Sequence, residues 1–247
     1  MLNEQTYQKM MDMKLTAMAE AFRELQREAP SNQRSFAEKV THMIDAEWIA
    51  RENRRLTRLL RAAKLTHDAA MEDVWTTQGR GITKTVVREL STCRWVDNHH
   101  NVICVGKTGC GKSYLAAALG QVACRHGHRT LYTRVPRLLQ QLAIARADGT
   151  YARLLARLAK VNVLILDDFL IAPLKDAERR DLLEILEDRY GHSSTVITSQ
   201  LATGQWHAAL GDPTVADAIC DRVVHNAHVL TLTGPSGRKQ KGLNTKT

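Results

Sequence analysis

The stretch NVICVGKTGCGKSYLAAAL, residues 101–119, contains a short apolar run, a glycine-rich turn and then a helical pattern. Its turn satisfies the spacing G-x-x-x-x-G-K-[ST] of a phosphate-binding loop, with Gly106, Gly111, Lys112 and Ser113 at the defining positions. Glycines let backbone N–H groups turn toward phosphate oxygens, and the start of the following helix adds its positive end. The stretch therefore predicts a strand, a nucleotide site and a helix. A strand–helix turn that contains lysine by chance is the alternative.

Within this loop the side chains have separate predicted tasks. Lys112 is predicted to reach the β- and γ-phosphates and to take part in catalysis, and the Ser113 hydroxyl to ligate Mg²⁺. The residues predicted to contact the nucleotide are Gly106, Lys107, Thr108, Gly109, Cys110, Gly111, Lys112, Ser113 and Tyr114.

A second stretch, VNVLILDDFL at residues 161–170, ends a buried strand with two adjacent carboxylates. Adjacent like charges repel, and carboxylates at the end of a buried strand are costly unless something uses them. A phosphate-binding loop needs a carboxylate at the end of a second strand to hold Mg²⁺, and we predict that Asp167 has this role. Asp168 is then placed to orient or deprotonate the water that attacks the γ-phosphate. The alternative for Asp168 is a cap for the following turn.

The first part of the chain is predicted to be helical throughout. Apolar residues at helical spacing from Tyr7 to Leu25 predict one helix, which Pro30 ends. Ser35 and Glu38 have the spacing of a capping box, which predicts the start of a second, longer helix.

Beyond about residue 98, short apolar strands alternate with helical segments. This alternation predicts an α/β fold, with a parallel sheet that helices cover on its faces. The predicted strands are 101–105, 129–133, 162–167, 194–199 and 227–232. The predicted organisation is a helical N-terminal domain at 1–75, a linker at 76–98, an ATPase domain at 99–236 and a basic tail at 237–247.

The composition limits the classes of protein to be considered. Lys and Arg number 35 against 26 Asp and Glu, a formal net charge of +9, which favours a polyanionic partner. The five cysteines form no C-x-x-C pair, so neither a disulfide framework nor a zinc ribbon is indicated. No apolar run approaches the roughly 18 residues of a membrane span. We therefore expect a cytoplasmic protein without a membrane partner.

The phosphate-binding loop, LILDDF at 164–169 and ITSQLATGQWHAALGDPTVADAICDRVVHNAHVLTLTGPSGRK at 197–239 together carry a family resemblance. The sequence resembles the AAA+ ATPases of the IstB/DnaC group, and most closely the IstB-like helpers of insertion-sequence transposition. The resemblance implies an AAA+ P-loop core with parallel sheet order 5-1-4-3-2. It also implies a homo-oligomer that uses ATP and Mg²⁺ on double-stranded DNA, and a transposase encoded beside it as partner. Too few residues follow the last predicted strand for the C-terminal helical lid usual in AAA+ proteins.

The resemblance also assigns roles to individual residues. The first sensor of the γ-phosphate falls on Thr198, Ser199 or Gln200, and the Gln200 amide is one candidate to orient water. Arg222 matches the arginine finger, which reaches the ATP of a neighbouring subunit; an ordinary exposed helix position is the alternative. Arg238 occupies the place of a second sensor that contacts the nucleotide.

A row of arginines lies on the second predicted helix. Arg51, Arg54, Arg55, Arg58 and Arg61 share one helical stripe, hereafter the arginine stripe. Guanidinium groups suit the phosphates of DNA, and the lack of an accompanying aromatic ladder favours duplex over single-stranded DNA. The solvated face of a structural helix is the alternative. A second basic run, residues 129–160, could line the same DNA path.

The predicted function is that of an ATP-dependent, double-stranded-DNA-binding AAA+ ATPase that assembles on target DNA and recruits or stimulates a transposase. A DnaC-like loader of a replicative helicase is the alternative, because the core motifs do not separate the two. A metabolic P-loop kinase is disfavoured by Asp168, Arg222 and the arginine stripe. A GTPase is disfavoured because no N-K-x-D sequence occurs.

Overall fold

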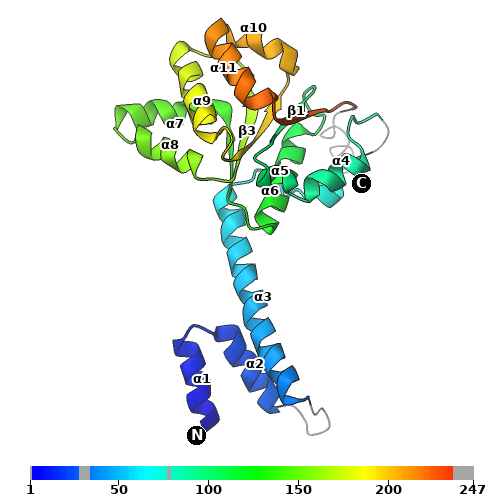
Figure 1. Cartoon of the computed structure of the whole chain (residues 1–247), viewed down its shortest axis with the longest axis vertical. Coiled ribbons are helices and arrows are strands. Elements are labelled where there is room, and N and C mark those ends of the chain that lie inside the picture. Colours follow the sequence, from blue (N-terminus) through cyan, green and yellow to red (C-terminus); the bar gives the residue numbers. More distant parts are fainter. Residues whose placement is uncertain (1, 28–33, 77–78, 236–247) are drawn as a thin grey trace, which may run out of the picture. The chain divides into compact units, whose positions relative to one another are not determined.

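The computed structural model describes residues 2–27, 34–76 and 79–235 (Figure 1). The chain divides into two compact units, Met1–Arg58 and Leu59–Thr247. No helix of the described residues is long and apolar enough to cross a membrane.

The N-terminal unit contains two short helices and most of a long one. They are α1 (Leu2–Asp12), α2 (Thr16–Arg27) and α3 (Phe36–Ala63), which continues into the second unit. The capping box is confirmed: the Ser35 amide donates to Glu38 Oε2 at 2.6 Å, and the Glu38 amide donates to Ser35 Oγ at 3.3 Å. Pro30 lies outside the described residues.

The single helix expected from Tyr7 to Leu25 is wrong, because the chain turns between α1 and α2. Lys14 has a left-handed φ of 60° at this turn. The buried Glu47 carboxylate of α3 accepts the amides of Ala17 at 3.0 Å and Met18 at 3.3 Å. A carboxylate there satisfies N–H groups that have no partner within a new helix, so a residue far along the chain favours a second helix start.

The second unit is built around a five-stranded parallel sheet. Its strands are β1 (Asn101–Val105), β2 (Thr130–Arg134), β3 (Val163–Phe169), β4 (Ser194–Ser199) and β5 (Ala227–Thr231). The order across the sheet is β2-β3-β4-β1-β5, and every neighbouring pair is parallel. Read from the opposite edge, this is the expected order 5-1-4-3-2, so the α/β fold is confirmed.

Helices cover both faces of this sheet, as Figure 1 shows. On one face α4 (Lys84–Ser91), α5 (Arg94–Asp97) and α6 (Lys112–Arg125) pack with Val102 and Cys104 of β1. On the other face, Ile103 and Val105 of β1 pack in a cluster with five helices: α7 (Val135–Ala147), α8 (Tyr151–Ala159), α9 (Asp176–Arg189), α10 (Trp206–Leu210) and α11 (Pro213–Val224). Short 3₁₀ turns occupy Met71–Asp73 and Thr203–Gln205. The alternation along β1 is what a strand buried on both faces requires.

Much of the stretch 76–98, expected to be a linker, packs against the core. It contains α4 and α5, and Leu90 and Trp95 belong to the hydrophobic cluster around α6. One of its glycines serves close packing: a Cβ on Gly81 would lie 1.9 Å from the Thr231 carbonyl oxygen of β5. The glycine at position 81 therefore reflects the close approach of two backbone segments, which the sequence alone does not distinguish from a flexible linker.

Candidate functional site

The phosphate-binding loop joins β1 to α6, so the nine predicted nucleotide contacts lie between the end of a central strand and the first turn of a helix. Gly106 has a φ of 150°, and a Cβ there would lie 2.2 Å from the Leu232 carbonyl oxygen. Gly111 precedes α6 with a φ of 105°. These positions require glycine, the first for space and both for backbone conformation.

Lys112 is held inside this loop. Its side chain is largely buried, and Nζ donates to the carbonyl oxygens of Gly106 at 2.7 Å and Lys107 at 3.0 Å. The ammonium therefore lies among the backbone groups predicted to surround the phosphates. The helix start beside it adds N–H groups and a positive dipole end, which together suit an anion.

Asp167 receives hydrogen bonds from three different elements. Ser113 Oγ of α6 donates to Asp167 Oδ1 at 2.9 Å, and Thr198 Oγ1 of β4 donates to the same oxygen at 2.5 Å. Tyr132 of β2 donates through its phenol to Oδ2 at 2.5 Å. The Asp167 side chain is buried, and the donors compensate the cost of burying its charge.

A carboxylate beside a serine hydroxyl fits the oxygen donors that Mg²⁺ prefers. The predicted metal ligands Ser113 and Asp167 lie within hydrogen-bond distance of one another at the end of the phosphate loop. Mg²⁺ is usually held by only one or two carboxylates together with the phosphates of its substrate, so this donor set fits that cation.

Asp168 lies beside Asp167 in an unusual backbone conformation. Its φ is 59°, and the pairing of β3 with β4 shifts register between Leu166 and Phe169. In a regular strand adjacent side chains point to opposite faces of the sheet, whereas a bulge or similar irregularity changes the direction of the side chain. The Asp168 amide donates to Thr198 Oγ1 at 3.1 Å, so one threonine contacts both aspartates.

The Asp168 carboxylate is paired with a cation from the neighbouring strand. Arg134, the last residue of β2, donates through Nε to Asp168 Oδ2 at 2.7 Å. This hydrogen bond to Asp168 raises the pKa of Arg134. The residue predicted to activate water is thereby connected to the edge strand of the sheet.

The three candidates for the first sensor differ in their surroundings. Thr198 contacts Asp167, as described above, and Ser199 Oγ donates to the Phe169 carbonyl at 2.9 Å. Gln200 is exposed beyond the end of β4. The hydroxyl of Thr198, rather than the Gln200 amide, is the group held in the carboxylate cluster.

Arg222 lies near the amino-terminal ends of the strands, whereas the loop follows the carboxyl-terminal end of β1. The Asn101 side-chain amide, at the start of β1, donates to the Arg222 carbonyl at 3.3 Å, whereas the loop follows Val105. Four residues of strand separate those ends by about 13 Å. The Arg222 guanidinium pairs with Glu187, with Nη2 donating to Oε1 at 2.9 Å. Arg238, the predicted second sensor, lies outside the described residues.

In the arginine stripe, Arg51, Arg54 and Arg55 form ion pairs with carboxylates of the same helix. Arg51 Nε and Arg54 Nη2 donate to Glu47 Oε1 at 2.8 and 3.1 Å, and Arg55 lies 3.6 Å from Glu52. Burial would raise the pKa of Glu47, but the hydrogen bonds from Arg51 and from the α2 amides lower it. Among the described residues Arg58 and Arg61 have no ion-pair partner, so the C-terminal half of the stripe presents its charges to solvent.

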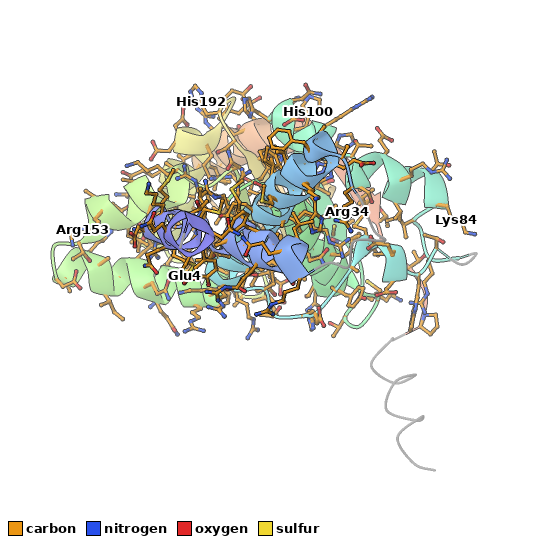
Figure 2. All side chains as sticks on the ribbon, turned by 90° about the horizontal axis from the view of Figure 1, so that it is seen from below. Glu4, Arg34, Lys84, His100, Arg153 and His192 are labelled. Carbon is orange, nitrogen blue, oxygen red and sulfur yellow. The ribbon has the colours of Figure 1, made fainter. Side chains whose placement is uncertain are left out.

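A basic groove of about 940 Å³ lies along β2, α7 and α8 of the second unit. Its wall carries seven exposed basic residues and a single acidic one, Asp148. The basic residues are Lys64, Arg129, Arg134, Arg137, Arg153, Arg157 and Lys160. Figure 2 labels Arg153 on the α7–α8 helix pair (green). The predicted basic run 129–160 thus gathers on one surface, except that Arg146 pairs with Asp181 instead.

Sequence reasoning missed two side chains of the carboxylate cluster, Tyr132 and Arg134. Both also line the basic groove. A signal was available: in the expected sheet order β2 neighbours β3, and Arg134 is in register with Asp167. Aligning the ends of the two predicted strands would have placed a polar β2 terminus beside the aspartates.

Comparison with known proteins identifies similar sequences over almost the whole chain. Residues 8–245 match the family described as IstB-like ATP binding protein. An insertion sequence ATP-binding protein of Sinorhizobium fredii is 49% identical over 241 residues, which cover 98% of each chain.

Solved structures match this chain over about 70% of its length at lower identity. The crystal structure of DnaI is 23% identical with a TM-score of 0.58, covering 72% of this chain and 94% of that chain. The crystal structure of the DnaC helicase loader is 22% identical with a TM-score of 0.56, covering 69% of this chain and 100% of that chain. These likenesses show the AAA+ fold.

Proposed function

This chain belongs to the family of IstB-like ATP binding proteins, and from that premise we propose that it hydrolyses ATP with Mg²⁺ while assembled on double-stranded DNA. We further propose that it recruits or stimulates a transposase encoded beside it. The observation that carries the ATPase proposal is the convergence of Lys112, Ser113 and two aspartates at one end of the sheet.

Each of these residues has a distinct proposed task. Lys112 binds the β- and γ-phosphates, and Ser113 with Asp167 would hold Mg²⁺, which supplies positive charge to the phosphate oxygens. Asp168 orients the attacking water or takes its proton. Thr198, which contacts both aspartates, is the first-sensor residue that the geometry supports best.

The DNA-binding proposal rests chiefly on the basic groove. Phosphate contacts supply most of the sequence-independent affinity for DNA, and six exposed cations along one groove, besides Arg134, which pairs with Asp168, suit a phosphate backbone. The arginine stripe is a second proposed contact, in which Arg58 and Arg61 carry the available charges. Arg51 and Arg54 instead have a structural task, because they neutralise the buried Glu47.

Oligomerisation is proposed from the position of Arg222. About 13 Å of strand separates the amino-terminal end of β1, beside which Arg222 lies, from the loop of the same chain, so a role at ATP requires the nucleotide of a neighbouring subunit. An arginine suits this role because its guanidinium is always charged and spreads over several developing phosphate charges.

ATP turnover with and without plasmid DNA tests the proposal. Wild-type protein should hydrolyse ATP and respond to duplex DNA. Lys112→Ala should lose ATP binding, whereas Asp168→Asn should bind ATP and fail to hydrolyse it, because it removes the base and keeps Lys112, Ser113 and Asp167. Asp217→Asn, at an exposed position of α11, is the matched control and should behave as wild type.

Two results would contradict the assignment. Equal loss of ATP binding in Lys112→Ala and Asp168→Asn would refute the division of tasks. A response confined to single strands or to a replicative helicase, with no binding of a neighbouring transposase in a co-purification assay, would favour the DnaC-like loader instead.

A further inference from the structure

Tyr132 is a tyrosine of the edge strand β2 whose phenol contacts the carboxylate proposed to hold the metal. Its hydroxyl donates to Asp167 Oδ2 at 2.5 Å, and its ring is buried in the cluster that covers the α6 face of the sheet. Burial, together with the hydrogen bond to Asp167, raises the pKa of Tyr132.

The donors divide the two oxygens of Asp167 between them. Oδ1 faces Ser113 Oγ, the other proposed metal ligand, and also accepts from Thr198. Oδ2 points the other way, toward β2, and accepts from Tyr132. A carboxylate with a strong donor at one oxygen is fixed in rotation, which sets the direction of the other oxygen.

We infer that Tyr132 is a positioning residue for the divalent cation, acting through Asp167: its phenol orients the carboxylate so that Oδ1 stays beside Ser113. The inference rests on the proposed function, because it assigns the cation of bound MgATP to this carboxylate. The competing explanation is packing alone, in which the ring fills the α6 face and the hydroxyl merely finds an acceptor.

Tyr132→Phe separates the two explanations because phenylalanine keeps the ring and removes only the donor. Two affinities are measured in the absence of DNA: that of a non-hydrolysable ATP analogue in EDTA, and that of Mn²⁺ for the protein–analogue complex by electron paramagnetic resonance. Loss of an outer-shell donor to a metal ligand typically lowers metal affinity roughly 10- to 100-fold. We expect Mn²⁺ affinity to fall about 10-fold, while analogue affinity in EDTA stays within about two-fold.

Tyr151→Phe is the matched control. Tyr151 also donates its phenol to carboxylates, those of Asp181 at 2.8 Å and Glu184 at 2.6 Å, but on α8 and α9 rather than at the loop. It should leave Mn²⁺ affinity unchanged. ATP turnover by Tyr132→Phe should fall at limiting Mg²⁺ and return toward the wild-type rate at high Mg²⁺, since affinity is lost rather than chemistry.

Three results would overturn the inference: wild-type Mn²⁺ affinity in Tyr132→Phe, an equal loss in Tyr151→Phe, or a parallel loss of analogue binding in EDTA, which would indicate general damage to the loop. Failure of the proposed function looks different. In that case the wild-type protein itself shows no cation-dependent binding of the analogue, and the role of Tyr132 falls with it.

Discussion

Removing two cations from the basic groove should change the salt dependence of DNA binding by a calculable amount. Arg153 and Arg157 are exposed, one helical turn apart on α8, and both line the groove. If each contacts one phosphate, Arg153→Gln with Arg157→Gln should flatten the slope of log affinity against log salt by roughly 1.8, or 0.9 for each contact. At 0.1 M salt the same relation gives a loss of affinity of roughly 60-fold.

The assay is fluorescence anisotropy of two unrelated labelled duplexes, titrated at several salt concentrations with a non-hydrolysable ATP analogue present. Lys84→Gln with Arg88→Gln is the matched control, because it removes the same charge from exposed positions of α4. Figure 2 labels Lys84 and Arg153 on opposite sides of the second unit. ATP turnover without DNA should be unchanged in both double variants.

The refuting result is a wild-type slope in the groove variant. A flattened slope in Arg58→Gln with Arg61→Gln, alongside an unchanged groove variant, would move the DNA surface to the arginine stripe. A comparable change in the α4 control would mean that net charge, rather than a specific surface, governs the binding.

Three further substitutions test other contacts. Arg222→Ala should retain ATP binding and lose most ATP turnover. Mixing it with Lys112→Ala protein should restore turnover, because the Lys112 variant supplies an intact Arg222 to its neighbour; no rescue in demonstrated mixed oligomers would make Arg222 an ordinary surface residue. Arg134→Gln should raise DNA-independent turnover, measured as phosphate release, because it releases Asp168 from its ion pair; unchanged turnover would contradict that. Arg189→Ala should lower the free energy of unfolding by roughly 3 kcal/mol in urea titrations, because it leaves two buried carbonyls and a partly buried one without their donor; a loss below about 1 kcal/mol would show that water replaces it.

The parts of the fold that depend on local pattern could be predicted from the sequence. The loop at Gly106–Ser113 and the strand before Asp167 follow from spacing and apolar runs, and the sheet order followed from the family resemblance. The break between α1 and α2 could not be predicted, because it depends on Glu47, 30 residues from the amide of Ala17 that it accepts.

Side-chain pairing across elements was the second limit. Sequence places Arg54 on an exposed stripe, yet its partner Glu47 lies two turns away on the same helix and also contacts α2. The Arg134–Asp168 pair joins two strands, and no sequence pattern indicates the left-handed backbone conformation that orients the Asp168 side chain. Such contacts depend on three-dimensional register, which periodicity does not report.

The contact between Gly106 and Leu232 has a consequence for synthesis of the protein. The first glycine of the loop packs directly on the Leu232 carbonyl, and the Leu232 amide donates to Val105 at 2.7 Å. On the ribosome, β1 and α6 are synthesised long before Leu232. A nascent chain therefore carries the complete loop sequence without the Leu232 backbone that packs against Gly106. Nucleotide capture should therefore begin only once Leu232 has emerged, and prematurely terminated chains would not compete with finished protein for ATP.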